Sequence, residues 1–275
     1  MDKPAGPTSH DVVAAVRRAT GMRRVGHAGT LDPFATGLLT VLVGRATRLA
    51  PFLVGLDKTY EGTLELGRTT DTDDATGTVV ADAPVAVGDA QLRAAMGILT
   101  GTLAQIPPAF SAKKVAGRPA HRSARRGRPE HLAPVAVHVA RFAFQGRDGN
   151  RVRFTADVGS GTYIRALARD LGAHLGCGAH LVTLRRTAVG PWPVTEAVSL
   201  ADILEHGPQV LPAREAVRHL PIRVLNADEA VAVRHGRAVP DGDGDGPVAL
   251  LADGTLLAVA LREGHVLRPT VVLAA

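Results

Sequence analysis

One carboxylate, Asp32, lies in a stretch of restricted backbone at residues 26–37 (G-H-A-G-T-L-D-P-F-A-T-G). Glycines in this stretch permit positive φ angles or close backbone approach. Pro33 fixes its own φ and biases Asp32 away from helical conformation, and the side chains of Thr30 and Thr36 can bond nearby backbone. An acid on so rigid a loop is positioned for chemistry. The alternative is a turn whose aspartate only accepts hydrogen bonds from backbone donors.

This stretch resembles the catalytic loop of the TruB-type tRNA pseudouridine-55 synthases, in which the aspartate is the nucleophile. Four further segments resemble motifs of the same family, in the order that the family requires. They are residues 2–13 (D-K-P-A-G-P-T-S-H-D-V-V), 58–60 (K-T-Y), 161–172 (G-T-Y-I-R-A-L-A-R-D-L-G) and 184–187 (L-R-R-T). Together the five matches extend over most of the chain and imply a site-specific tRNA pseudouridine synthase.

The resemblance implies that Asp32, Tyr60 and Arg165 are catalytic. We pair Arg165 with Asp32, because a guanidinium can hold a carboxylate ionised and aim it through forked hydrogen bonds. Tyr60 would stack on the target uracil and is a candidate for removing the C5 proton. Without the resemblance, Arg165 would be interpreted as solvated surface and Tyr60 as a residue of high β propensity.

The implied reaction moves the glycosidic bond of a uridine from N1 to C5 and needs no metal and no redox or nucleotide cofactor. The carboxylate attacks either the sugar C1′ or the ring C6, and the sequence does not choose between them. The base must leave its stack, and stacking on an aromatic ring offsets much of that cost. His27 is expected to insert where the base leaves, and Leu184 to line the base pocket.

A basic segment at residues 113–128 corresponds to the thumb of the family, an insertion at residues 106–130 that contacts RNA. Seven Lys or Arg residues occur there with no acid until Glu130, and contacts of this kind to phosphate are independent of sequence. The family commonly has an aromatic residue where this chain has His121. The full set expected to bind the substrate is His27, Tyr163, Leu184, Lys3, Lys113, Lys114, Arg125 and Arg126.

The bulk composition agrees with an RNA-binding enzyme. The chain has 275 residues and a formal net charge of +6, which favours a polyanionic partner. Its single cysteine, Cys177, precludes an intramolecular disulfide and fits a reducing compartment. We find no signal peptide and no apolar run of membrane-spanning length. We therefore expect a cytoplasmic monomer that binds tRNA without an obligate protein partner and without a membrane.

The hydrophobic periodicity predicts an α+β protein with a mixed or antiparallel sheet flanked by helices. Helices are expected over 10–20, 46–56, 89–99 and 162–175, and strands over 37–43, 59–66, 151–158 and 181–189. Residues 71–76 (D-T-D-D-A-T) are expected to form a polar loop. The predicted domains are a catalytic domain over 1–218 and a small β-rich domain over 219–275.

The C-terminal domain resembles a PUA domain, an RNA-binding module, and the alternative is an appendage that only packs on the catalytic domain. Within it, residues 241–246 (D-G-D-G-D-G) suggest a calcium loop. An EF-hand needs a glutamate at loop position twelve, which is Ala252 here, so we interpret the stretch as an acidic turn.

Two other functions remain open at the level of the sequence. One is a non-catalytic RNA-binding or RNA-folding protein on a synthase scaffold, which basic charge and a C-terminal RNA-binding domain would serve equally well. The other is an enzyme directed by a guide RNA, as in archaeal and eukaryotic relatives. The joint presence of Asp32, Tyr60 and Arg165 argues against the first. The thumb-like insertion argues against the second.

Overall fold

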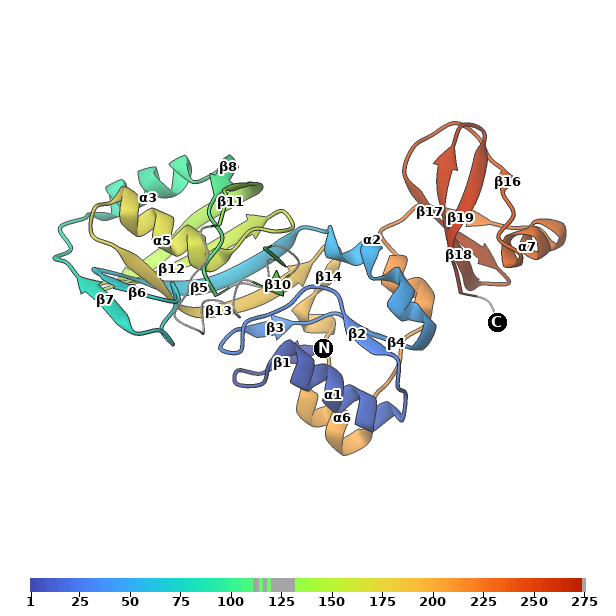
Figure 1. Cartoon of the computed structure of the whole chain (residues 1–275), viewed down its shortest axis with the longest axis horizontal. Coiled ribbons are helices and arrows are strands. Elements are labelled where there is room, and N and C mark those ends of the chain that lie inside the picture. The colour runs from blue at the N-terminus through green and yellow to red at the C-terminus, as the bar shows by residue number, and fades with distance from the viewer. Residues whose placement is uncertain (111–113, 116–117, 120–131, 274–275) are drawn as a thin grey trace.

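The computed structural model describes residues 1–110, 114–115, 118–119 and 132–273, which form two main sheets at opposite ends of an elongated molecule (Figure 1). Within these residues the larger sheet has eight strands. In order they are β1 (Asp2–Lys3), β3 (Thr36–Leu38), β13 (Ala179–Val189), β5 (Lys58–Leu66), β12 (Arg151–Val158), β11 (Val135–Asp148) and β8 (Gly101–Gln105), with β14 (Trp192–Pro193) beside β13. Only β13 and β3 pair in parallel among them, so the predicted α+β class with a mixed sheet is confirmed.

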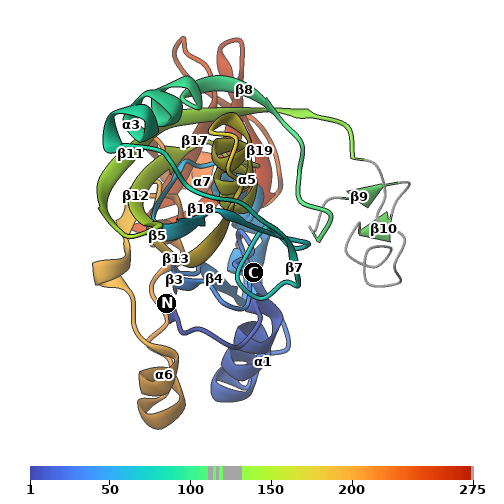
Figure 2. The same ribbon diagram turned by 90° about the vertical axis from the view of Figure 1, so that its left-hand side faces the viewer.

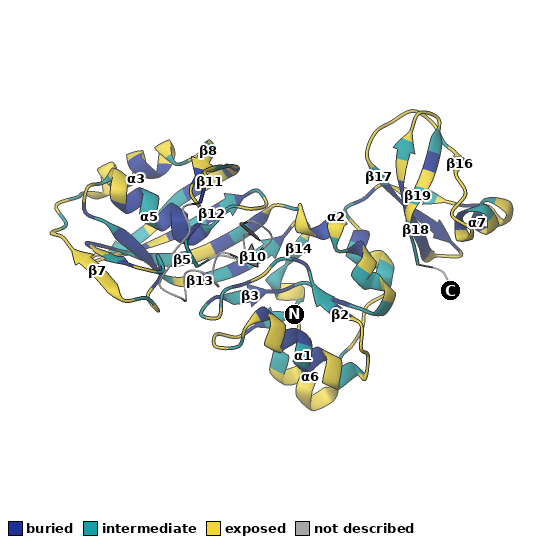
Figure 3. Cartoon of the chain, in the orientation of Figure 1, coloured by how far each residue is buried: buried dark blue, intermediate teal, exposed yellow. Residues whose placement is uncertain are grey.

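Two helices, α3 (Asp89–Ile98) and α5 (Ile164–His174), cover one face of this sheet, with α3 on β11 and α5 on β13 (Figure 2). The covered face carries the core. Along β12 every second residue is buried, as an alternating strand requires (Figure 3). Helix α5 presents Leu167 and Leu171 to the same core. The predictions for β5, β12, β13, α3 and α5 are confirmed to within two residues at each end.

The N-terminal helix α1 (Ser9–Thr20) shows how local sequence sets its ends. Thr8 and Asp11 form a reciprocal capping box, and Gly21 ends the helix at a φ of 65°. Helix α1 packs against α6 (Leu200–His206), which the sequence analysis did not predict. In the part of the chain that the structure describes, no helix is long and apolar enough to cross a membrane.

The predicted strand over 37–43 is wrong, because the chain there forms two short strands in different sheets. Strand β3 joins the large sheet, whereas β4 (Val41–Val43) pairs with β2 (Val25–His27). Gly37 has a φ of 102°, and a Cβ at this position would lie 2.2 Å from the Arg186 carbonyl oxygen. The close approach of two backbones therefore replaces a regular strand at this point.

The predicted helix over 46–56 is also interrupted. A 3₁₀-helix runs over Gly44–Leu49, and α2 (Pro51–Val54) begins at a proline, which has no N–H to continue the preceding turn. A hairpin of β6 (Arg68–Thr70) and β7 (Val79–Asp82) flanks the expected polar loop. This hairpin, β8 and β11 were absent from the predicted elements.

The C-terminal residues form a second sheet in the order β15-β17-β18-β19-β16, with one small helix. Its elements are β15 (Ile222–Val224), α7 (Ala227–Arg234), β16 (Val239–Pro240), β17 (Pro247–Ala252), β18 (Thr255–Glu263) and β19 (Val266–Val272). Short strands around one helix agree with the sequence pattern. In the predicted acidic turn, the Asp241 carboxylate accepts a hydrogen bond of 2.8 Å from Arg262.

Candidate active site

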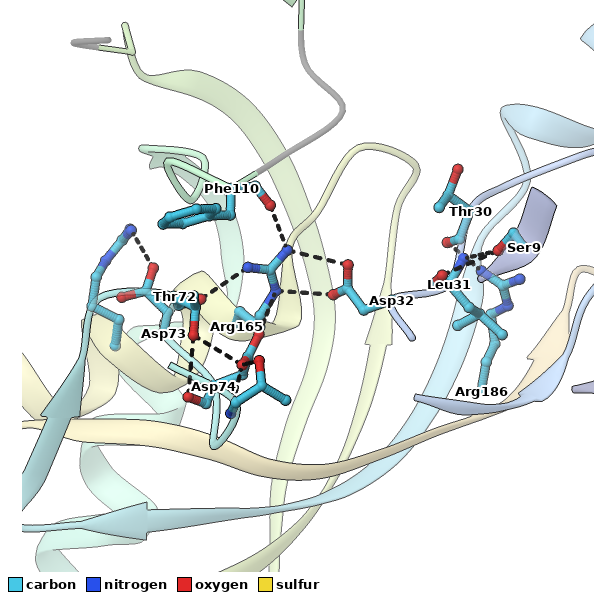
Figure 4. A network of polar contacts seen from close by, with 12 residues as sticks. Ser9, Thr30, Leu31, Asp32, Thr72, Asp73, Asp74, Phe110, Arg165 and Arg186 are labelled. Carbon is cyan, nitrogen blue, oxygen red and sulfur yellow. Dashed lines mark hydrogen bonds and ion pairs between the residues drawn. The ribbon is translucent and has the colours of Figure 1, made fainter. Parts of the chain in front are cut away.

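Asp32 and Arg165 form a forked ion pair between two segments that lie 133 residues apart in the sequence (Figure 4). Arg165 Nε donates to Asp32 Oδ2 at 2.9 Å, and Nη2 donates to Oδ1 at 3.2 Å. The Arg165 side chain is only 5% exposed, whereas that of Asp32 is 35% exposed. The arginine is therefore fixed within the protein while the carboxylate faces solvent, where a substrate can reach it.

Three further acceptors surround the Arg165 guanidinium. Nη1 donates to the Thr72 carbonyl oxygen at 2.8 Å, and Nη2 donates to the Phe110 carbonyl oxygen at 2.9 Å. A second carboxylate, Asp74, lies 3.5 Å from Nε and is buried. The planar guanidinium thus has its orientation set by acceptors on several sides.

Asp74 is a site residue that the sequence analysis missed. Its Oδ1 accepts hydrogen bonds from the Thr72 hydroxyl and from the backbone and hydroxyl of Thr76. The loop is tied to β13 through Ala75 N–H to the Leu181 carbonyl at 2.8 Å. The only sequence signal was the acidic composition of residues 71–76, which is equally typical of a solvated loop.

The backbone that carries Asp32 is held by buried polar side chains from outside the loop. Ser9 Oγ accepts from Leu31 N–H and donates to the Leu31 carbonyl. Arg186 Nη2 donates to the Gly29 carbonyl at 3.0 Å, and its Nη1 donates to the Thr30 carbonyl. Because side chains from α1 and β13 bond this backbone directly, the loop is rigid in the way its glycines and proline predict.

Lys3 belongs to this loop-holding set, and its geometry does not suit the predicted contact with substrate. The side chain is fully buried, and Nζ donates to the carbonyls of Pro4, Pro33 and Ala35 at 2.7–3.1 Å. An ammonium has three hydrogens, so all of them are used. Burial lowers the pKa of Lys3, and the nearby Asp32 carboxylate opposes that shift.

Tyr60 and Leu184 both lie in the core beneath the site. Tyr60 is on β5 and Leu184 on β13, and each is 7% exposed. They share one apolar cluster with Leu31, which directly precedes Asp32, and with Ile164, which directly precedes Arg165. These two predicted pocket residues therefore belong to the same apolar core as the neighbours of the ion pair in the sequence.

His27 is the last residue of β2 and lies five residues before Asp32 in the sequence. Its ring meets that of His10 edge-on, with 5.5 Å between centroids. Burial lowers the pKa of His27, and the positive neighbours His10 and Arg186 lower it further. A neutral, half-buried ring of this kind is suited to packing against a base.

Tyr163 occupies the residue before helix α5. Its backbone N–H donates to Gln105 Oε1 at 2.9 Å, and its carbonyl accepts from Gln105 Nε2 at 3.2 Å. Gln105 is itself fully buried and was not recognised in the sequence. This reciprocal pair fixes the start of the helix that carries Arg165.

The remaining predicted residues fall in the basic segment. Lys113, Arg125 and Arg126 lie outside the described residues. Lys114 is in the short strand β9 (Lys114–Val115), which pairs with β10 (Arg118–Pro119). Among all the residues that the structure describes, no three His, Cys, Asp or Glu side chains are grouped so that they could hold a metal ion.

Comparison with known proteins gives consistent matches along the whole chain. The profile of the TruB family pseudouridylate synthase N-terminal domain matches residues 17–164. The profile of the tRNA pseudouridylate synthase B C-terminal domain matches residues 165–226, and that of the tRNA pseudouridine synthase II C-terminal domain matches residues 220–274. The chain is 25% identical to a chain in the structure of an H/ACA RNP bound to a substrate RNA containing 2′-deoxyuridine, with a TM-score of 0.76, covering 100% of this chain and 84% of that one.

Two curated relatives are similar over nearly their full length. The tRNA pseudouridine synthase B of Thermobifida fusca is 48% identical, covering 100% of this chain and 97% of the relative. That of Mycobacterium bovis is 44% identical, covering 99% of this chain and 94% of the relative. The forked ion pair lies on two of the five motifs that first suggested this family, and the chain belongs to the TruB family of pseudouridylate synthases.

Proposed function

We propose that this enzyme isomerises the uridine at position 55, in the T-loop of tRNA, to pseudouridine with Asp32 as nucleophile. The observation that carries the proposal is the forked Asp32–Arg165 ion pair, in which a buried guanidinium holds a solvent-facing carboxylate. The relatives named tRNA pseudouridine synthase B support tRNA as the substrate.

In the proposed reaction the Asp32 carboxylate attacks C1′ of the sugar or C6 of the uracil. The bond between N1 and C1′ breaks, the base rotates while it is held in the site, and a bond from C5 to C1′ forms. If the carboxylate attacked C1′, C5 displaces it from C1′ as the new bond forms; if it attacked C6, it leaves C6 after that bond has formed. C5 loses a proton and N1 takes one up, so the product is an isomer of the substrate. Nucleophilic catalysis of this kind requires an ionised carboxylate at a fixed position, and Arg165 supports both requirements through charge and through two hydrogen bonds.

Tyr60 and Leu184 are proposed to form the base pocket, with Tyr60 stacking on the uracil and accepting the C5 proton directly or through water. Tyr163 is proposed to bind substrate from the start of α5, and His27 to fill the position that the extruded base leaves. Stacking on an aromatic side chain contributes about 1–3 kcal/mol per base. That range is comparable to the few kcal/mol needed to unstack the base.

The basic segment is proposed to contact phosphates through Lys113, Lys114, Arg125 and Arg126. For Lys3 we propose a different role from the one expected, because its three buried hydrogen bonds leave no donor for RNA. It holds the Asp32 loop. The boundary near residue 218 and a PUA-like RNA contact by the C-terminal sheet complete the proposed domain arrangement.

Stand-alone action in the cytoplasm belongs to the same proposal. The thumb-like insertion supports recognition of tRNA without a guide RNA or a protein partner. The proposed substrate and the single cysteine, Cys177, agree with a reducing compartment that contains tRNA.

The test is tritium release from a tRNA transcript labelled at C5 of uridine, with wild type beside Asp32→Asn. We expect release by wild type and none above background by Asp32→Asn, with both proteins binding the tRNA. If the wild-type protein binds tRNA tightly but releases no tritium, the protein is a non-catalytic RNA-binding protein and the proposal is wrong.

A further inference from the structure

Helix α5 carries a second arginine, Arg169, one turn after Arg165. Like Arg165, it bonds one residue near position 73 and one carbonyl between positions 106 and 110. Arg169 Nη1 donates to the Asp73 carboxylate at 3.1 Å, and Nη2 donates to the Ile106 carbonyl at 2.7 Å. Residues four apart on a helix lie on the same face. The two arginines therefore bridge the same two segments, one around residues 72–74 and the other around residues 106–110.

Residues 105–110 are attached to α5 and to its N-cap residue Tyr163 at three points. Gln105 bonds the Tyr163 backbone with both atoms of its amide, Ile106 bonds Arg169, and Phe110 bonds Arg165. The last of these contacts uses Arg165 Nη2, which also donates to Asp32 Oδ1. A displacement of the Phe110 carbonyl would therefore change the hydrogen bonding of the nucleophile itself.

The other bridged segment also depends on Arg169. Asp73 has a φ of 61°, which is unfavourable for a residue with a Cβ. Its carboxylate is largely buried, which raises the pKa of Asp73, and the charge of Arg169 opposes that shift. Without Arg169 this carboxylate would lose its hydrogen-bonded partner and the larger of the two arginine charges that offset its burial, the other being that of Arg165. The neighbouring Thr72 carbonyl, which accepts from Arg165, would lose support with it.

We propose that Arg169, with Gln105, is a positioning residue for catalysis: it holds the Thr72 and Phe110 carbonyls where they orient Arg165 toward Asp32. Arg169 makes no contact with Asp32, so it acts through Arg165 alone. Because it positions the nucleophile's partner rather than RNA, its loss should slow the chemical step and leave tRNA affinity unchanged. This inference rests on the proposed role of Asp32.

The experiment compares Arg169→Met and Gln105→Met with wild type in single-turnover pseudouridine formation at saturating enzyme, together with the tRNA Kd. Both variants should lower the single-turnover rate about 10- to 100-fold, the range expected when reacting groups are displaced by about 1 Å. Neither should change the Kd. Because both residues hold one segment, the double variant should lose less than the product of the single losses.

Arg151→Met is the matched control, because it removes an Arg–Glu pair of 3.2 Å at the surface of the large sheet, between β12 and β5. A surface pair of this kind contributes little. It should keep the wild-type rate. Arg169→Lys keeps the charge, but its shorter side chain has one nitrogen in place of the two, Nη1 and Nη2, that reach Asp73 and Ile106. Its rate should therefore fall between those of wild type and Arg169→Met. This variant also carries the test if Arg169→Met does not fold.

Three outcomes would overturn the proposal: a wild-type rate in Arg169→Lys or Arg169→Met, a loss of tRNA affinity equal to the loss of rate, or an equal loss in Arg151→Met. An inactive wild-type enzyme would instead contradict the proposed function, so the two failures are distinguishable.

Discussion

At the scale of single residues, two carboxylates, those of Asp32 and Asp74, lie beside the Arg165 guanidinium. In the proposed reaction Asp32 loses its charge when it forms a covalent bond with the substrate, which leaves a buried guanidinium without that partner. A buried unpaired charge is strongly unfavourable. Asp74, buried and 3.5 Å from Arg165 Nε, is a second carboxylate beside the arginine. We therefore expect Asp74 to stabilise Arg165 in the proposed intermediate as well as in the resting site.

Neutralising Asp74 should slow the reaction without preventing RNA binding. In Asp74→Asn, Arg165 keeps Asp32 as its only carboxylate, so the ion pair tightens in the ground state and loses its compensation in the intermediate. Interactions with a charged hydrogen-bonding group contribute about 1.5–3 kcal/mol, so we expect the single-turnover rate to fall about 10- to 100-fold with the tRNA Kd unchanged.

The control for this substitution is Asp82→Asn, which neutralises the exposed partner of Arg68 on the adjacent hairpin. It should behave as wild type. Equal rates for Asp74→Asn and Asp82→Asn would show that the second carboxylate near Arg165 has no part in the chemistry.

At the scale of elements, hydrophobic periodicity predicted the regular strands and helices. The prediction failed where an irregular backbone interrupts that periodicity. The alternation in β12 identified that strand from Arg151 to Val158. In β11 the register shifts between Val139 and Arg141 and again between Phe144 and Gly146. Bulges of this kind interrupt the period of two on which the prediction depends, which is consistent with its omission.

The residues of the candidate site could likewise be predicted only in part. The pairing of Asp32 with Arg165 was inferable because both residues lie in motifs of one family. Asp74, Gln105 and Arg169 contribute through contacts between segments distant in the sequence, and no local spacing encodes such contacts. A polar loop and a helix surface give the same pattern whether or not they meet at a site.

The loop that carries Asp32 gives a prediction about stability. Lys3→Met removes the ammonium that bonds three carbonyls of the N-terminal segment and the loop. Each buried acceptor left without a donor lowers the free energy of unfolding by about 1–3 kcal/mol, and each kcal/mol lowers Tm by roughly 2–4 °C in a protein of this size. Thermal unfolding measures this loss, and the salt dependence of tRNA binding should stay as in wild type.

Lys114→Met provides the contrast, because Lys114 is proposed to contact phosphate. It should leave Tm unchanged and reduce the slope of log K against log salt by about one unit. If Lys3→Met instead changed that slope and kept the wild-type Tm, Lys3 would contact RNA, and the proposal that it holds the Asp32 loop would be wrong.

At the scale of the whole molecule, the C-terminal sheet shares a core with the N-terminal part rather than resting on a flexible linker. Leu49, at the end of the 3₁₀-helix, lies in one apolar cluster with Leu251, Leu256 and Val259 of the C-terminal sheet. Arg45 and the neighbouring Arg48 donate to the carbonyls of Leu273 and Val272 at 3.1 and 2.5 Å. A shared core of this kind fixes the C-terminal sheet relative to the site and couples the unfolding of the two parts.

Leu49→Ala therefore tests whether the two parts unfold together. The side chain is fully buried, so truncation should cost about 2–5 kcal/mol and lower Tm by roughly 5–15 °C. Differential scanning calorimetry should show one transition in wild type that moves as a whole in the variant. Leu204→Ala, the same change at a position 58% exposed on α6, should leave the transition in place. Two separate transitions in wild type would mean that the parts are independent. The C-terminal sheet could then change its orientation relative to Asp32 when RNA binds.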